Sequence, residues 1–315
     1  MLPVKIMNFY KALLVLTALL INTVFAQPNK VLIINSDSTI YRYQENASEF
    51  KKILQQNAYQ WTELDLASHA TESEEELKHL VQKDTAPLIY CIGTKAYSFV
   101  RGIAKGKKLL FSAAINWRRL DIGTETYGVA NELSPSQELS LLRYFFPNVK
   151  KIGLLYNEKF SREYVETVKQ DALAMGMEIL NQPINKEDEV DTAMNGLLDK
   201  VDIFWIISDP IVLSSNDSVQ KIFSAAKKHH KPVYAYSDVF IEQGAVLAIS
   251  ADIATIGRQS ANLIMMIDNH KLPAGTVQIP AGSTVTLNKC SIDALNINFN
   301  QDALDSVNQL VNCKE

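Results

Sequence analysis

Short apolar runs rich in Val, Ile and Leu alternate with longer amphipathic segments, and this alternation constrains the fold more than any other feature. Apolar runs without strict polar alternation are typical of strands that are covered on both faces. Strands that alternate with helices pair in parallel, because each helix returns the chain to the edge where the previous strand began. The sequence therefore predicts an α/β fold with doubly wound parallel sheets.

The predicted strands are residues 30–35, 60–66, 87–93, 108–115, 150–157, 178–184, 203–208, 232–237 and 245–250. The predicted helices are residues 47–56, 72–82, 95–102, 136–145, 162–175, 187–198 and 214–228. Capping residues agree with this assignment: Ser134 precedes Pro135 at one helix start, and Ser214 or Ser215 caps another. The pattern runs once over residues 30–116 and again over residues 150–250, which predicts two similar lobes with a cleft between them.

Polar and aromatic residues gather where these strands end. Ligands of open parallel sheets bind beyond the carboxyl ends of the strands, beside loops and helix N-termini. The candidate ligand-binding residues are Ser36, Asp37, Gly93, Thr94, Asn116, Asn157, Ser208, Asp209, Tyr236, Ser237 and Asp238. Each also has a plain structural interpretation, because Asp, Asn and Ser at strand ends often only cap helices or close turns. Their recurrence at matching ends in both halves favours a ligand site.

The N-terminus predicts the compartment. Lys5 and Lys11 precede the apolar run of residues 12–25, which ends in small residues at the cleavage positions. We therefore expect residues 1–26 to be a cleaved secretory signal peptide and the protein to reach the periplasm of a Gram-negative bacterium. The run is shorter than the roughly 20 residues that span a bilayer, although an uncleaved membrane anchor is the alternative.

Charge, length and cysteine content narrow the class of protein. Removal of residues 1–26 takes two lysines, so the net charge moves from −4 to about −6, which disfavours nucleic acid as a partner. The remaining length predicts two domains. Three cysteines in an exported chain allow at most one internal disulfide; Cys290 and Cys313 are the candidate pair, whereas Cys91 lies inside an apolar strand and is expected to be an inert core thiol.

Catalytic motifs are absent from the sequence. It has no G-x-S-x-G elbow, glycine-rich phosphate loop, paired-cysteine motif or H-E-x-x-H. The five histidines fall in polar segments, so we expect no metal and no cofactor. Asp209 and Asp238 could form an acid–base pair, but nothing in the sequence places a nucleophile between them. The expectation is a binding protein that is not an enzyme, with an exported hydrolase as a further alternative.

A resemblance to a known family covers residues 127–295. It is carried by the order and spacing of several short features: Tyr127-Gly128-Val129, Pro147 before "IGLLYN", Ser208-Asp209, Ser237-Asp238 with Gly244, Gly257-Arg258-Gln259, and Asn288. In these features the chain resembles the substrate-binding proteins of ABC transporters related to the tryptophan- and tyrosine-binding type. The resemblance implies the type I periplasmic binding protein fold.

The resemblance also implies where an aromatic amino acid would bind. Backbone N–H groups and hydroxyls would hold its carboxylate, an aromatic side chain would stack on it, and Asp238 or Asp209 would accept its ammonium. Gly93 and Thr94 would contribute from the first lobe. The loop "SDSTIYRYQEN" and the pair Asn116-Trp117 depart from the family pattern, so the identity of the ligand stays open.

Family topology implies three connections between the lobes, near Tyr127, Ser250 and Val285, with residues 252–272 returning as a helix to the first lobe. We expect lobe 1 to comprise residues 27–126 and about 251–284, and lobe 2 residues 127–250 and about 285–315. We expect a monomeric periplasmic protein that captures a small organic ligand and delivers it to the membrane permease of an ABC transporter. An amino acid is the expected class of ligand. The alternative is a ligand-sensing subunit that signals to a membrane sensor.

Overall fold

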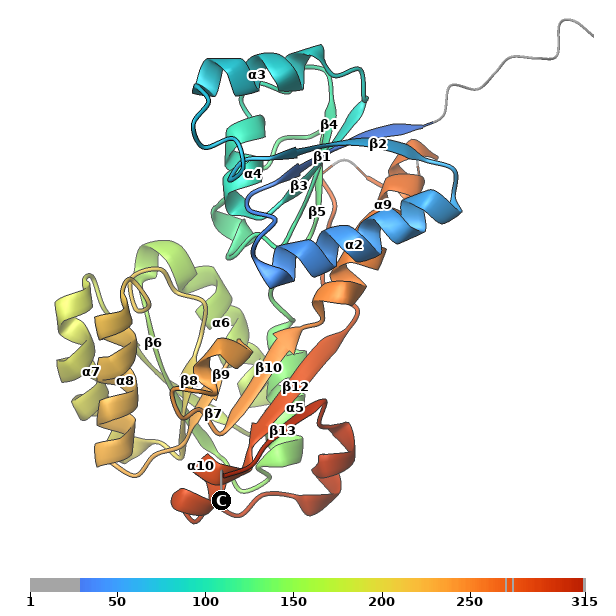
Figure 1. Cartoon of the computed structure of the whole chain (residues 1–315). Helices are drawn as coiled ribbons and strands as arrows, with labels where there is room; N and C mark the ends of the chain where they lie inside the picture. Colours follow the sequence, from blue (N-terminus) through green and yellow to red (C-terminus); the bar gives the residue numbers. More distant parts are fainter. Residues whose placement is uncertain (1–28, 270, 274, 314–315) are drawn as a thin grey trace, which may run out of the picture.

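The computed structural model describes residues 29–269, 271–273 and 275–313, so the expected signal peptide lies outside the described residues. Two sheets, each covered by helices on both faces, make up this part of the chain (Figure 1). Most of the predicted strands and helices are present within a few residues of their expected limits. The prediction of a two-lobed α/β architecture is confirmed.

The first sheet is parallel throughout, as the alternation of strands and helices predicts. In spatial order its strands are β11 (Val277–Gln278), β5 (Thr126–Val129), β4 (Lys108–Ser112), β3 (Leu88–Ile92), β1 (Lys30–Asn35) and β2 (Gln60–Asp65). Successive side chains of β1 point to opposite faces, because a strand has a period of two. Val31 and Ile33 pack with α2 (Tyr41–Gln56) and α9 (Ile253–Asp268), whereas Leu32 and Ile34 pack with α3 (Glu74–Lys83) and α4 (Thr94–Val100).

The second sheet is mixed. In spatial order its strands are β13 (Gln309–Val311), β12 (Ser283–Asn288), β10 (Leu247–Ala251), β9 (Val233–Ala235), β8 (Ile203–Ile206), β6 (Lys151–Tyr156) and β7 (Glu178–Pro183). Its helices are α5 (Pro135–Phe145), α6 (Glu158–Ala174), α7 (Val190–Leu197), α8 (Asn216–Lys228) and α10 (Lys289–Ala294). The strands β10 and β12 pair antiparallel, which the expectation of purely parallel lobes did not include. The chain passes from β11 of the first sheet into β12 without a helix between them, and β12 therefore runs opposite to β10.

Short 3₁₀ helices complete the described chain. They are η1 (Trp117–Arg119), η2 (Glu187–Glu189), η3 (Leu198–Lys200), η4 (Asp238–Phe240) and η5 (Gln301–Ser306). Two of them, η1 and η4, follow strands β4 and β9 and so lie at the carboxyl ends of the two sheets. They are therefore placed to contribute to a site between the sheets.

The described chain passes between the two sheets three times. It leaves the first sheet after β5, returns to it after β10 through α9, and leaves it again after β11. In Figure 1 these connections form the waist of the molecule, where the long strands β10 and β12 rise toward the first sheet. Any movement of one sheet relative to the other must bend these segments.

Close packing of α2 against α9 builds the face of the first sheet nearest the waist. A Cβ atom at Gly257 would lie 2.4 Å from the carbonyl oxygen of Asn46, so only glycine allows this approach. Helix α2 begins at Tyr41, six residues before the predicted start at Ala47. The N-cap residue Ile40 has no side chain that could cap the helix, so the sequence lacks a start signal there.

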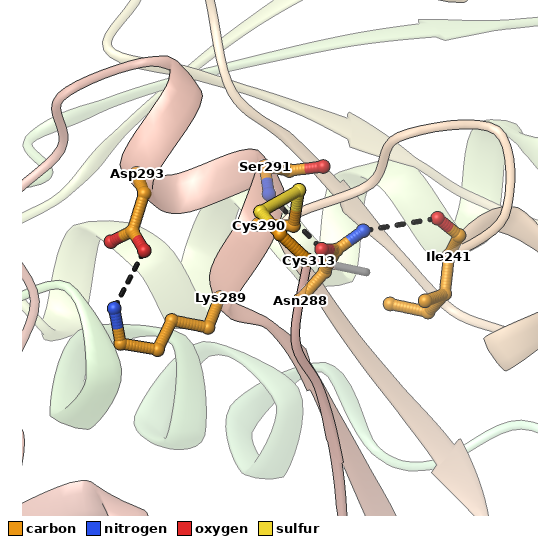
Figure 2. Close-up of a disulfide and its surroundings, with 7 residues drawn as sticks. All are labelled: Ile241, Asn288, Lys289, Cys290, Ser291, Asp293 and Cys313. Atoms are coloured by element: carbon orange, nitrogen blue, oxygen red, sulfur yellow. Dashed lines mark hydrogen bonds and ion pairs between the residues drawn. A yellow bond between two sulfur atoms is a disulfide. The ribbon is translucent and has the colours of Figure 1, made fainter. Parts of the chain in front are cut away.

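A disulfide ties the C-terminal strand to the second sheet. Cys290 in α10 and Cys313 after β13 are bonded, with their Cα atoms 4.8 Å apart (Figure 2). Beside them, the side chain of Asn288 accepts a hydrogen bond from the backbone N–H of Ser291 and donates one to the carbonyl of Ile241. The third cysteine, Cys91, is buried in β3, where burial strongly raises the pKa of its thiol. A neutral thiol of this kind is unreactive.

Candidate functional site

Two adjoining cavities lie between the sheets, at the carboxyl ends of their strands. The inner cavity holds about 30 Å³ and the outer cavity about 210 Å³. Asn131, Tyr236 and Ala251 line both of them. The inner cavity is also lined by Asn116, Arg118, Glu132, Leu133, Glu138, Ser161, Tyr164, Ser208 and Ile249. The outer cavity is also lined by Ile40, Arg42, Tyr43, Ala113, Ile115, Ser237, Val239 and Ser250.

Four of the residues predicted from the sequence line these cavities: Asn116, Ser208, Tyr236 and Ser237. Asn116 adopts a left-handed backbone conformation (φ 50°) just before η1. Its amide nitrogen points across to the second sheet, 3.4 Å from the carbonyl oxygen of Phe160 and 3.5 Å from that of Ser208. Asn116 therefore bridges the two lobes at the back of the cleft.

The other predicted residues of the first lobe form internal contacts. The hydroxyl of Ser36 donates to the carbonyl of Ile92 (2.7 Å) and accepts from the backbone N–H of Ala96 (2.9 Å), so it fixes the start of α4. Asp37 accepts two hydrogen bonds from Thr39 in the same turn. Gly93, with φ 87°, and the adjoining Thr94 begin α4. None of these side chains lines the described cavities.

Gly93 nevertheless shapes the outer cavity. A Cβ atom there would lie 2.6 Å from the Ser36 hydroxyl and 2.9 Å from the ring of Tyr43. The absence of that atom lets the Tyr43 ring, which lines the cavity, rest against the backbone. Burial raises the pKa of the Tyr43 hydroxyl, so it stays a neutral donor and acceptor.

The buried carboxylate of Asp209 is fully occupied by its own lobe. One oxygen accepts from the backbone N–H groups of Ile211 (2.9 Å) and Val212 (3.0 Å). The other accepts from the N–H of Asn157 (2.8 Å) and the hydroxyl of Ser161 (2.6 Å). Asn157 in turn caps α6 and donates to the carbonyl of Ile184. This network holds the ends of β6 and β8 together and leaves no oxygen of Asp209 free for an ammonium.

Asp238 lies at the rim of the cleft and joins the lobes. Its carboxylate is 3.1 Å from a guanidinium nitrogen of Arg42, and the two side chains are 43% and 30% exposed. Three apolar residues surround this pair on the outer cavity: Ile40, Ile115 and Val239 are 43%, 43% and 61% exposed. The rim is thus apolar with one ion pair across it.

Two glutamates that were not among the predicted site residues line the inner cavity. Glu138 accepts hydrogen bonds from the hydroxyls of Tyr164 (2.8 Å) and Tyr234 (3.0 Å). Burial raises the pKa of Glu138 to about 8, with the nearby Glu132 adding to the effect. Trp205 packs against both tyrosine rings, at centroid distances of 6.4 and 5.3 Å. Glu138 is therefore a largely neutral acid at pH 7.

Glu132 comes from the first connection between the sheets. Its Oε1 accepts a hydrogen bond from the backbone N–H of Asn116. Its Oε2 is buried and has no hydrogen-bond partner within the described chain. Burial raises the pKa of Glu132, whereas Asn116 and the charge of Arg118 lower it. The sequence of residues 130–138, "ANELSPSQE", indicates only a crossover followed by a helix start. Neither glutamate is therefore predicted to be a site residue from the sequence.

Arginine and aromatic rings form the remaining wall of the inner cavity. The guanidinium of Arg118 lies 4.9 Å from the ring centre of Trp117 and 5.9 Å from that of Tyr164. These distances are within the range of favourable cation–π contact. Among the described residues, no ion pair engages Arg118. The site therefore presents one cation, one incompletely bonded carboxyl and several aromatic faces.

No group of three or more His, Cys, Asp or Glu residues in residues 29–269, 271–273 and 275–313 could hold a metal ion. None of the helices in these same ranges combines the length and apolar character that crossing a membrane requires.

Comparisons with known proteins identify the family of this chain. Residues 42–311 match the family model described as ABC transporter substrate binding protein. The tyrosine-binding protein of Clostridioides difficile (strain R20291) is 24% identical over 193 residues, which cover 58% of this chain and 55% of that protein. The chain thus matches about half the length of this curated relative.

Several solved structures share the fold. A ligand-free, open substrate-binding protein with adhesive properties from Clostridium difficile has a TM-score of 0.70 and 20% identity, over 91% of this chain and 100% of that one. The ABC domain in complex with L-Trp from Streptococcus pneumonia has a TM-score of 0.62 and 18% identity, over 90% and 100%. Because the family model spans most of its length, the chain belongs to the ABC transporter substrate-binding protein family and has the type I periplasmic binding protein fold.

Proposed function

We propose that this protein binds a small ligand of the amino-acid class between its lobes and delivers it to the membrane permease of an ABC-type importer. The observation that carries the proposal is the composition of the cleft. Both lobes contribute to two adjoining cavities lined by two arginines, carboxyl groups, hydroxyls and aromatic rings. Such a wall suits a ligand with charged ends and an apolar body. We assign the protein a binding role without catalysis.

An aromatic amino acid is the proposed member of this class. Tyr43 and Tyr236 line the outer cavity, together with the apolar residues Ile115 and Val239. Aromatic faces favour stacking with an indole or phenol ring. The tyrosine-binding relative and the structure bound to L-Trp support this choice, although each name describes only that protein.

The remaining expectations form part of the same proposal. The protein is exported through residues 1–26, works as a monomer in the periplasm of a Gram-negative bacterium, and closes its lobes around the ligand. We place the lobe boundaries at the three connections, after β5, after β10 and after β11, because β5 and β11 pair within the first sheet. A closed form recognised by the permease would report that the site is occupied.

A ligand screen tests the binding role. We expect the mature protein to gain about 5 °C in unfolding temperature with L-tryptophan or L-tyrosine at a hundred times the dissociation constant. Tyr236→Ala should abolish the gain, because this ring lines both cavities. The matched Tyr144→Ala, at an exposed site on α5, should keep it. No gain with any proteinogenic amino acid would refute the proposed ligand class.

Uptake measurements test the delivery role. Cells that lack the gene should lose high-affinity import of the radiolabelled ligand, and the wild-type gene should restore it whereas Tyr236→Ala should not. If the purified protein binds the ligand but its loss leaves import unchanged, the permease partner is wrong. The sensing alternative, in which the closed form engages a membrane receptor, would then replace it.

A further inference from the structure

Glu132 Oε2 is a buried polar atom without a partner in the described chain, and such atoms are rare in folded proteins. Leaving an acceptor of this kind unbonded destabilises the folded protein, and more strongly when the group is charged. The other oxygen of Glu132 is held by the backbone N–H of Asn116, so the side chain is fixed in place. A position kept at such a cost points to a partner that binds there.

The empty space beside Glu132 has the size of a small polar group. The inner cavity of about 30 Å³ compares with the roughly 10–15 Å³ that one water-sized group needs. It adjoins the outer cavity, because Asn131, Tyr236 and Ala251 line both. A head group can therefore occupy the inner cavity while the rest of the same ligand fills the outer one.

Charge in the inner cavity comes mainly from two side chains. Arg118 lines the cavity over its aromatic neighbours, and no ion pair within 4.0 Å joins it to Glu132 in the described chain. Glu138 adds little charge at pH 7, because burial keeps it largely neutral even though two tyrosine hydroxyls donate to it. An arginine and a carboxyl group that face one cavity without pairing match a ligand that carries both charges.

The other acids near the cleft have partners already. Asp209 accepts four hydrogen bonds from its own lobe. Asp238 is paired with Arg42 at the rim. Both oxygens of Glu138 accept from tyrosine hydroxyls. A divalent metal is a poor occupant as well, because a lone glutamate beside an arginine offers too few oxygen ligands.

We propose that Glu132 Oε2 accepts the ammonium group of a zwitterionic ligand and that Arg118 binds its carboxylate. This assignment rests on the proposed function and names the residues that select its substrate class. It replaces the aspartates that the family resemblance had suggested. The ligand body then extends past Tyr236 into the outer cavity, where the rings of Tyr43 and Tyr236 contact it.

Calorimetric titration of three matched ligand types tests the assignment. The probes are L-tryptophan and L-tyrosine, their deaminated analogues indole-3-propionate and 3-(4-hydroxyphenyl)propionate, and their decarboxylated analogues tryptamine and tyramine. In the wild-type protein, loss of the amino group should weaken binding about 100-fold, and loss of the carboxylate about 10-fold, as expected for hydrogen bonds to charged groups.

Two variants with matched controls assign these losses to residues. Glu132→Gln should reduce the preference for an amino group to below about 5-fold, whereas Glu163→Gln, at an exposed site on α6, should keep it. Arg118→Met should remove the preference for a carboxylate, whereas Arg119→Met should keep it, since Arg119 lies over Phe160 and lines neither cavity. A full amino-group preference in Glu132→Gln would overturn the assignment while leaving the proposed function intact.

A measurement on the ligand-free protein tests the assignment of Glu132 separately from the proposed function. Carboxyl carbon NMR, assigned by comparison with Glu132→Gln, should give Glu132 a pKa above its ordinary value of 4.5, because burial raises it. An ordinary pKa would mean that Oε2 has a partner in the empty protein, and this would overturn the inference. Failure of all six compounds to bind the wild-type protein would refute the proposed function, whatever the NMR result.

Discussion

The second sheet and the first connection between the lobes each place a buried acid near the cleft, and the two acids differ sharply. Asp209, at the end of β8, accepts four hydrogen bonds from groups of its own lobe. Glu132, between β5 and α5, has one oxygen bonded to Asn116 and one with no partner in the described residues. Asp209 completes a structural hydrogen-bond network, whereas Glu132 Oε2 can still accept a hydrogen bond at a cavity.

This difference shows how residues that look alike in a sequence can be separated by function. A carboxylate whose acceptor positions are filled stabilises the fold and cannot bind another donor. A carboxyl oxygen without a hydrogen-bond partner lowers the stability of the ligand-free protein but can accept a hydrogen bond from a ligand. Stability and binding should therefore respond in opposite ways to substitutions in the two regions, and the following predictions rank the acids by expected effect.

The largest effect is expected at Asp209. Asp209→Asn should lower the free energy of unfolding by about 4 kcal/mol, because an amide group cannot accept from all four donors and turns its own N–H groups toward some of them. Urea denaturation measures the change. Asp217→Asn, at an exposed site on α8, is the control and should stay within about 0.5 kcal/mol. Equal losses of unfolding free energy in Asp209→Asn and Asp217→Asn would show that the buried acid stabilises the fold no more than an exposed one.

The next effect is a pH dependence due to Glu138. Its pKa is raised from 4.5 to about 8 in the folded protein, so unfolding releases a proton between these values. Stability from this group is complete below pH 4.5 and falls as pH rises toward 8, by about 3 kcal/mol between pH 5 and 7.5. Glu138→Gln should flatten this part of the stability curve. Curves that stay parallel for wild type and variant would show that Glu138 ionises normally.

A smaller change of opposite sign is expected at Glu132. Glu132→Gln should raise the stability of the empty protein by about 1 kcal/mol at pH 8, because it removes a buried charge and keeps an acceptor for Asn116. The gain should shrink toward pH 5, because burial raises the pKa of Glu132 and so favours its protonated form as the pH falls. Chemical denaturation at both pH values checks this. A loss of stability comparable to that of Asp209→Asn would place Glu132 with the structural acids.

The smallest effect is expected at the rim. Asp238→Asn should change the unfolding free energy by less than about 1 kcal/mol, because its pair with Arg42 is partly exposed and screened by solvent and salt. Amino-acid affinity, measured by calorimetry, should change less than about threefold. A hundredfold loss of affinity would instead return the ammonium site to Asp238, as the family resemblance implied.

The architecture could largely be predicted from the sequence because burial on both faces of a strand leaves a direct pattern. The run "KVLIIN" is β1 without any shift of its ends, whereas Tyr127, expected at a crossover, lies inside β5 of the first sheet. The short strands β11 and β13 were missed, because two or three residues carry no periodicity. The start of α2 was missed because Ile40 gives no capping signal.

The site was harder to predict, because a sequence shows where a polar residue lies but not what bonds it already has. Asn116 and Tyr236 were found from their positions at strand ends, and they do line the cleft. Asp209 has the same kind of position, yet two of its four hydrogen bonds come from Asn157 and Ser161, about 50 positions away in the sequence. Glu132 follows a strand too short to stand out, so its role depends wholly on three-dimensional contacts.

The three passages between the sheets mean that neither lobe is a continuous stretch of the chain. A single proteolytic cut in any one connection would leave the halves joined by the other two. A gene fragment ending at residue 250 would encode a first sheet without α9, exposing the face of α2 that Gly257 approaches so closely. In evolutionary terms, neither lobe can be exchanged by one recombination event, so the hinge and the two surfaces of the cleft are inherited together.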